Sequence, residues 1–263
     1  MPVVLTPFTH GTLCHGWAWT IGDVPQLALY VARVAMGQSR HVAKVLAGVN
    51  VAPPPTSESV RATAINLLTV SAGADPWHRD GWIFQTISWL AANRANPSAV
   101  IRAPHMILAH KGFDGLQLEI DTSNGFVTAA VIFEDRATDN PRDTIRDEVW
   151  PDFKLLEAGE RENVLSADVS ALLITRPDID ADRAIENIIW KQIRRYRVSI
   201  TVGATHASPE GRQRLFRGFD DIASGDVQRR RGEILHIEQL RPWMASLAAA
   251  AISAINAMAV ANV

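Results

Sequence analysis

The segment from Lys111 to Asn140 constrains the fold of this chain more than any other. Two β-rich runs, about 114–121 and 126–134, flank a turn-forming Ser-Asn-Gly at 123–125. An Asn-Gly pair between two such runs is typical of a β-hairpin. The second run is nearly all apolar, as expected of a central strand that is buried on both faces. The segment therefore predicts two neighbouring strands inside a covered sheet.

Charged residues mark one edge of this predicted hairpin. Asp114 stands at the start of the first strand, and Glu134 and Arg136 stand at the end of the second. Glu134 and Arg136 share a face of their strand because side chains alternate with a period of two. Two carboxylates suit a hard divalent cation, and a neighbouring guanidinium suits a phosphate. The edge therefore predicts a site that holds a metal ion against a phosphate.

The rest of the chain alternates helical and strand patterns. We expect helices over 25–48, from Ser57, over 80–95, from Pro141, over 181–197, from Ser208 and from Leu240, and further strands over 105–109, 197–203 and 233–237. From residue 80 the order is helix, three strands, helix and strand. This order predicts an α/β fold with helices on both faces of a mixed sheet.

A proline run provides the clearest break in the sequence. Ala52-Pro53-Pro54-Pro55-Thr56 is a stiff segment between two helical patterns. We therefore divide the chain into a helical N-terminal extension (1–55), a core (56–203) and a C-terminal strand and helix extension (204–263).

Charge and cysteine content exclude some classes of protein. The net charge is −2, so any affinity for nucleic acid must come from a local patch or a partner. Cys14 is the single cysteine, which excludes an internal disulfide and a cysteine-rich zinc site. The N-terminus lacks the basic and then apolar pattern of a signal peptide. We expect a cytoplasmic protein.

The C-terminal segment 242–263 carries no charged residue. It is long enough to span a bilayer, but it is mostly alanine with interspersed Ser and Asn, and alanine contributes little to insertion. We expect no membrane span, and instead an apolar helix packed on the core or on another copy in a homo-oligomer.

The charged edge and the order of elements resemble the PD-(D/E)XK nuclease superfamily, whose restriction-endonuclease-like core is αβββαβ. Asp114 stands where that family has its first acid, and Glu134-Asp135-Arg136 stands where it has Glu-x-Lys. Gln85 resembles the Glu or Gln that many members carry on the first core helix. The resemblance covers about 78–203.

This resemblance implies a nuclease that depends on Mg²⁺ or Mn²⁺ and cleaves DNA or RNA, in bacterial antiviral defence or DNA processing. Asp114 and Glu134 would bind the metal, and Arg136 and Gln85 would complete the catalytic set. The resemblance also implies a protein partner, such as a helicase, sensor or effector subunit.

Arg136 departs from the family pattern. An arginine does not readily lose its proton, so it cannot serve as the base that a lysine can be. One alternative is therefore a catalytically degenerate subunit that binds nucleic acid or a partner protein of a defence complex. Another alternative gives these side chains a purely structural role. Arg136 would then form ion pairs with the neighbouring acids, and Gln85 would be a hydrogen-bonded amide in the core.

Basic residues outside the hairpin edge supply candidate phosphate contacts. Arg142 and Arg146 stand one helical turn apart just beyond the Glu-Asp-Arg triplet, and Arg194 and Arg195 close the helix expected over 181–197. Together with Lys111 at the start of the hairpin, they are the predicted nucleic-acid-binding residues.

Overall fold

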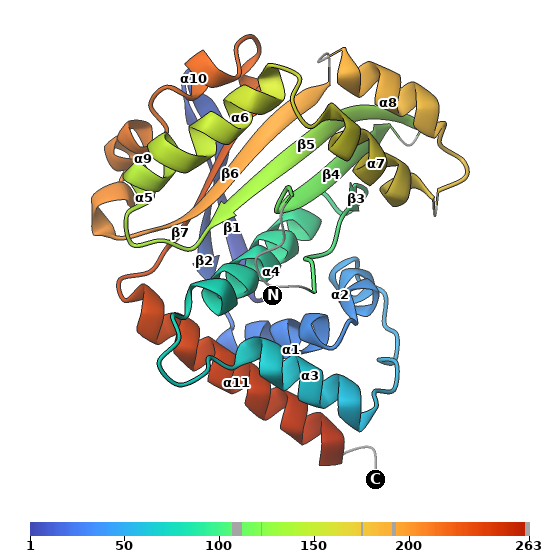
Figure 1. Ribbon diagram of the computed structural model, residues 1–263, viewed down its shortest axis with the longest axis vertical. Coiled ribbons are helices and arrows are strands. Elements are labelled where there is room, and N and C mark those ends of the chain that lie inside the picture. Colours follow the sequence, from blue (N-terminus) through green and yellow to red (C-terminus); the bar gives the residue numbers. More distant parts are fainter. Residues whose placement is uncertain (107–111, 122, 175, 191–192, 261–263) are drawn as a thin grey trace.

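The computed structural model places the chain around one mixed sheet (Figure 1). It describes residues 1–106, 112–121, 123–174, 176–190 and 193–260. The sheet has seven strands in the order β1-β2-β7-β6-β5-β4-β3. The strands are β1 (Val3–His10), β2 (Cys14–Ile21), β3 (Val100–Ile101), β4 (Gly115–Asp121), β5 (Phe126–Arg136), β6 (Arg194–Val202) and β7 (Arg230–His236). The expected α/β class and mixed sheet are confirmed.

The predicted hairpin is strands β4 and β5. They pair antiparallel, with Gly115 opposite Phe133, and their register shifts between Glu119 and Ile120. In the turn, the Asp121 carboxylate accepts hydrogen bonds from the backbone N–H of Ser123 and from the amide of Asn124. These side-chain bonds explain why polar turn residues fix the hairpin register. A further strand was expected over 105–109, but residues 107–109 lie outside the described part. The strand β3 lies before this segment, at Val100–Ile101.

Four neighbouring strands run parallel: β5 with β6, β6 with β7, and β7 with β2. The carboxyl ends of these strands therefore meet at one edge of the sheet. In open α/β sheets this edge is the usual place for ligands. Both the candidate site and a pocket beside α11 (Leu240–Val260) lie there.

The N-terminal residues correct one expectation, because the extension expected to be helical begins with the β1–β2 hairpin. β2 pairs with β7 across more than 200 residues of sequence, as in the partners His15 and Arg231. Gly16 and Gly232 let the two strands approach closely, since a Cβ at Gly16 would lie 1.7 Å from the Gly232 carbonyl oxygen. The segment 1–21 and β7 are thus parts of the central sheet rather than additions to it.

The helix expected over 25–48 is two helices, α1 (Val24–Ala35) and α2 (Ser39–Leu46). Gly37 lies between them with a φ of +75°, a left-handed conformation that glycine adopts without a steric penalty. The turn at Gly37 therefore ends the first helix.

Each face of the sheet carries its own apolar core. One core lies beneath the helices that follow β5 and β6, and Figure 1 shows them above the sheet. These are α5 (Pro141–Thr144), the π-helix η1 (Ile145–Val149), α6 (Trp150–Glu157), α7 (Glu162–Leu173), α8 (Ala181–Ile189), α9 (Pro209–Leu215) and α10 (Phe219–Ile222), with short 3-10 turns η2 (Ala204–His206) and η3 (Val227–Arg229).

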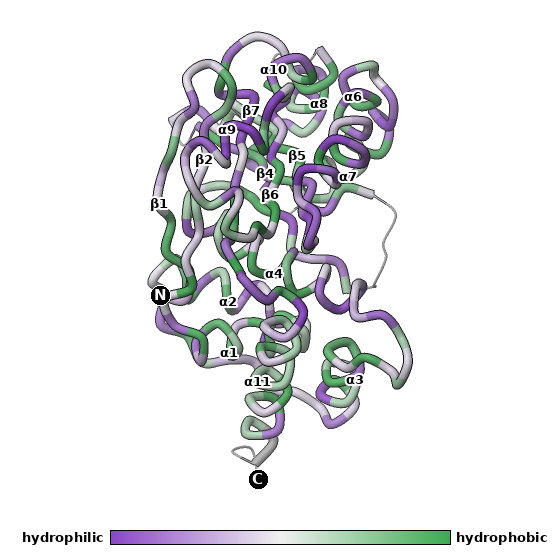
Figure 2. The backbone as a smooth tube through the Cα atoms, turned by 90° about the vertical axis from the view of Figure 1, so that its left-hand side faces the viewer, coloured by the Kyte–Doolittle hydropathy of each residue, from purple (hydrophilic) through white to green (hydrophobic). Residues whose placement is uncertain are grey.

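The second core joins the other face of the sheet to a group of helices. α4 (Trp77–Ala95) packs on β5 and β1, and α1, α3 (Glu58–Leu68) and α11 (Leu240–Val260) pack on one another. Figure 2 shows α1, α3 and α11 at the end of the molecule away from α6, α8 and α10. The buried carboxylate of Asp80 in α4 pairs with Arg79 and with Arg241, which ties α4 to the start of α11.

α11 packs within its own chain. Its buried residues include Met244, Leu247, Ala251 and Ile255, and its main neighbours are α1 and α3. Within the described residues, no helix combines the length and the apolar character that a bilayer crossing requires.

Candidate functional site

Three of the predicted site residues meet at the carboxyl end of β5. Arg136 lies between two acids: its Nη1 is 2.5 Å from Asp114 Oδ2, and its Nη2 is 2.8 Å from Glu134 Oε2. Glu134 and Arg136 share one face of β5 because they are two positions apart. Asp114 is the residue immediately before β4, and its side chain reaches the same point.

Gln85 joins the group from the opposite side of the sheet. Its Nε2 donates to Asp114 Oδ1 over 2.6 Å from α4. The backbone N–H of Asp135 donates to Asp114 Oδ2 over 2.8 Å. With Arg136, these donors hold the Asp114 carboxylate in one orientation.

The guanidinium of Arg136 faces four carboxylates. Besides Asp114 and Glu134, Glu148 Oε2 lies 3.5 Å from its Nε and Asp152 Oδ2 lies 4.0 Å from its Nη2. Burial alone would lower the pKa of Arg136, but the nearby carboxylates raise that pKa above its ordinary value. The side chain of Arg136 is 24% exposed, so solvent reaches this cluster, which we call the open cluster.

Glu134 is the most deeply buried acid of the open cluster, at 3% exposure. Burial raises its pKa well above the usual range, and the charge of Asp114 raises it further, while Arg136 opposes both effects. A buried carboxylate is costly unless a cation or hydrogen bonds compensate for lost hydration. The ionised form of Glu134 is therefore stable only next to a cation, and Arg136 supplies that cation here.

Glu148 and Asp152 are members of the site that the sequence interpretation did not include. They lie in η1 and α6, one helical turn apart, and both face Arg136. The sequence shows that these two acids are four residues apart. It does not show that their helix folds back over the end of β5.

Asp135 points to the other face of β5, beneath α4. Ser88 Oγ donates to Asp135 Oδ1 over 2.7 Å. Burial raises the pKa of Asp135 to about 7, although nearby Arg197 lowers it. Arg197 also pairs with Glu233 at 2.7 Å and donates to the Ser88 carbonyl oxygen. We call Asp135, Arg197 and Glu233 the sealed cluster, because all three are buried.

The predicted phosphate-binding arginines do not gather around the open cluster. Arg194 and Arg195 lie in β6 rather than in a helix, because α8 ends at Ile189. Arg194 is fully buried and bonds to Glu162, which leaves it no surface for a phosphate. Arg195 pairs with Glu119 at 2.7 Å.

The other predicted cations have partners or lie outside the described part. Arg142 donates to the carbonyl oxygens of Leu215 and Arg217. Arg146 is exposed and pairs with Asp143 and Asp147. Lys111 lies outside the described residues.

The chemistry of the open cluster is that of oxygen ligands and one fixed cation. Across the described ranges, no group of three or more His, Cys, Asp or Glu side chains is arranged to hold a metal ion. Asp114 and Glu134 supply hard oxygen donors at one point, which is the donor type that Mg²⁺ accepts. No family model, curated protein or solved structure matches this chain.

Proposed function

We propose that the chain is a nuclease that depends on Mg²⁺ or Mn²⁺ and hydrolyses phosphodiester bonds of DNA or RNA. The observation that supports this function is the meeting of Gln85, Asp114, Glu134 and Arg136 at the carboxyl end of β5. Asp114 and Glu134 would hold the metal through carboxylate oxygens. Both carboxylates already contact one cation, the guanidinium of Arg136.

The order of elements also supports a nuclease-like core. α4, the strands β3, β4 and β5, the helices that follow and then β6 come in the sequence expected of an αβββαβ core. β6 runs parallel to β5, and β4 runs antiparallel to it. In this proposal β1, β2 and β7 extend the core sheet.

Each side chain of the site has a distinct role in the proposed reaction. Asp114 and Glu134 would hold the metal, which when bound would neutralise phosphate charge and lower the pKa of a bound water. Arg136 keeps its proton, gives up the oxygens of Asp114 and Glu134, and offers its guanidinium to the phosphate. Gln85 keeps the Asp114 carboxylate in place. Glu148, whose side chain is 60% exposed, stands at the solvent side of the cluster.

The test is cleavage of labelled single- and double-stranded DNA and RNA by the purified chain with Mn²⁺, Mg²⁺ or a chelator. Glu134→Gln should lower a metal-dependent rate about 100-fold or more. Asp182→Asn, which changes an exposed acid on α8, is the matched control and should keep the wild-type rate. Absence of cleavage of every substrate with both metals would refute the proposal.

A second candidate function is a nuclease-like subunit that binds nucleic acid or a protein partner of a defence complex without cutting. The observation that favours it is the position of Arg136, which already satisfies both metal-binding acids from within the chain. Arg136→Lys separates the two functions. Metal-dependent cleavage that appears only with lysine identifies a degenerate nuclease, and cleavage by the natural chain identifies an active one.

A further inference from the structure

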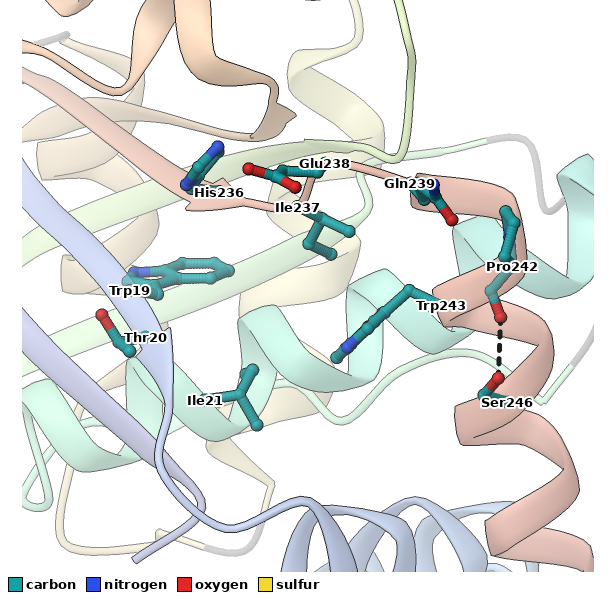
Figure 3. Close-up of a pocket in the computed structure, with 10 residues that line it drawn as sticks. All are labelled: Trp19, Thr20, Ile21, His236, Ile237, Glu238, Gln239, Pro242, Trp243 and Ser246. Carbon is teal, nitrogen blue, oxygen red and sulfur yellow. Dashed lines mark hydrogen bonds between the residues drawn. The ribbon is translucent and has the colours of Figure 1, made fainter.

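A pocket of about 630 Å³ lies at the carboxyl ends of β2 and β7, beside the first turns of α11 (Figure 3). It lies at the same edge of the sheet as the open cluster but is formed by other residues. Its volume falls within the range of small-molecule sites in proteins, about 300–1,000 Å³. The carboxyl ends of parallel strands are also where such sites are usually found.

Five of the ten residues that line the pocket are apolar: Trp19, Ile21, Ile237, Pro242 and Trp243. Figure 3 shows the indole of Trp243 extending from α11 toward β2, and the indole of Trp19 extending from β2 toward α11, with Ile21 and Ile237 around the same space. Trp19 is 2% exposed and packs against Phe84, so it is a fixed wall. Trp243 is only half-buried and offers its indole to a ligand.

Glu238 is the only Asp, Glu, Lys or Arg among the ten residues that line the pocket. The Arg197 guanidinium lies 5.4 Å from the ring centroid of the lining residue Trp19, and it is paired with Glu233. Arg241 lies next to the lining residue Pro242 in sequence, but its guanidinium pairs with Asp80 at 2.7 Å and Asp139 at 3.3 Å. A phosphate or carboxylate ligand would therefore meet a carboxylate with no lysine or arginine in the lining to balance it.

We propose that this pocket binds an organic ammonium cation that carries apolar substituents. A cation over an indole is stabilised by the electron-rich ring, most strongly by tryptophan among the aromatic side chains. Trp243 supplies that ring, Glu238 at the rim supplies the opposite charge, and the isoleucines contact the apolar substituents. This site does not depend on the nuclease proposal, because it shares no residue with the open cluster.

Ammonium groups of this kind come from free quaternary amines or from methylated lysine side chains of a protein. Calorimetric titration of the full chain with choline and with a trimethyllysine peptide compares the two sources. Tighter binding of the peptide assigns a protein ligand, and equal or tighter binding of choline assigns a small molecule. Both results support an ammonium site.

The matched probe is 3,3-dimethylbutan-1-ol, which has the shape of choline and no charge. We expect the alcohol to bind at least tenfold more weakly than choline. Trp243→Ala should raise the Kd for choline about tenfold or more, and Glu238→Gln about fivefold. Trp77→Ala and Glu58→Gln change an exposed tryptophan and an exposed glutamate outside the pocket, and they should leave the Kd unchanged.

Thermal unfolding of all four variants shows whether each is folded before its Kd is compared. Equal affinity for choline and the neutral alcohol would overturn the assignment of a cation site. Failure of choline and the peptide to bind the folded wild-type chain would overturn it as well, whatever the outcome of the cleavage assay.

Discussion

The two faces of β5 carry charged clusters that differ in their access to solvent. Glu134 and Arg136 belong to the open cluster, where the side chains of Arg136 and Glu148 are 24% and 60% exposed. Asp135, between them in sequence, belongs to the sealed cluster, whose three members are at most 5% exposed. Burial raises the pKa of Glu134 on one face and the pKa of Asp135 on the other.

The contrast separates two uses of charge within one triplet. The sealed cluster holds α4 on the sheet, because Ser88 contacts both Asp135 and Arg197. The open cluster places one cation among four carboxylates within reach of solvent. A raised pKa therefore does not identify a functional site unless a substrate can reach the group.

The largest expected effect comes from breaking the sealed cluster. Arg197→Met leaves Glu233 buried without its partner, so the free energy of unfolding should fall by about 3–5 kcal/mol. Urea unfolding measures this change. The double variant Arg197→Met with Glu233→Leu should recover most of the loss. A loss below about 1 kcal/mol in the single variant would show that the cluster does not anchor α4.

The same substitution in the open cluster is the matched comparison. Arg136→Met should cost only about 1–2 kcal/mol of stability, because water reaches Asp114, Glu148 and Asp152, and buried Glu134, whose pKa is already raised, can take up a proton. Under the nuclease proposal it should lower the cleavage rate about 100-fold. Equal losses of stability from Arg136→Met and Arg197→Met would remove the distinction between the two clusters.

The pH dependence of stability isolates Asp135. Its pKa is about 7 in the folded protein and near 3.8 when unfolded, so between these values the folded state binds more protons. Stability from this group is therefore complete below about pH 4 and declines as the pH rises to about 7, by at most about 1.4 kcal/mol per pH unit.

Asp135→Asn should remove this component. Urea unfolding of both proteins at several pH values gives the difference between their stabilities. That difference should change in favour of the variant as the pH rises toward 7. A constant difference would show that Asp135 does not titrate in this range.

The smallest expected effect concerns Gln85. Gln85→Leu removes one hydrogen bond that positions Asp114. This loss should raise the activation free energy of cleavage by about 1 kcal/mol and lower the cleavage rate about fivefold. Thr63→Val on the exposed surface of α3 is a control that also removes a side-chain hydrogen bond. A rate loss near that of Arg136→Met would make Gln85 more than a support for Asp114.

Local patterns in the sequence were sufficient for the hairpin and for the α/β class. Asp114, Glu134 and Arg136 could be placed together because hairpin pairing and the period of two are local rules. The sequence also indicated that Gln85 belonged to the site, through resemblance rather than through physical reasoning.

Long-range packing was beyond these rules. The pairing of β2 with β7 depends on residues such as Gly16 and Gly232, which are far apart in sequence and carry no periodic signal. Arg194 was misplaced because a run of arginines resembles the end of a helix, whereas here a strand buries the side chain. The return of Glu148 and Asp152 toward Arg136 was likewise a tertiary feature.

The position of β7 between β2 and β6 has a consequence for synthesis of the chain. Both β2 and β6 are synthesised before β7, and β2 is synthesised much earlier than β6. Each of these two strands therefore has one row of backbone groups unpaired until β7 is made. Such edges are prone to pair with other chains. Premature termination before Arg230 should therefore yield aggregates rather than a smaller folded unit, and closure of the sheet should be a late, slow step of folding.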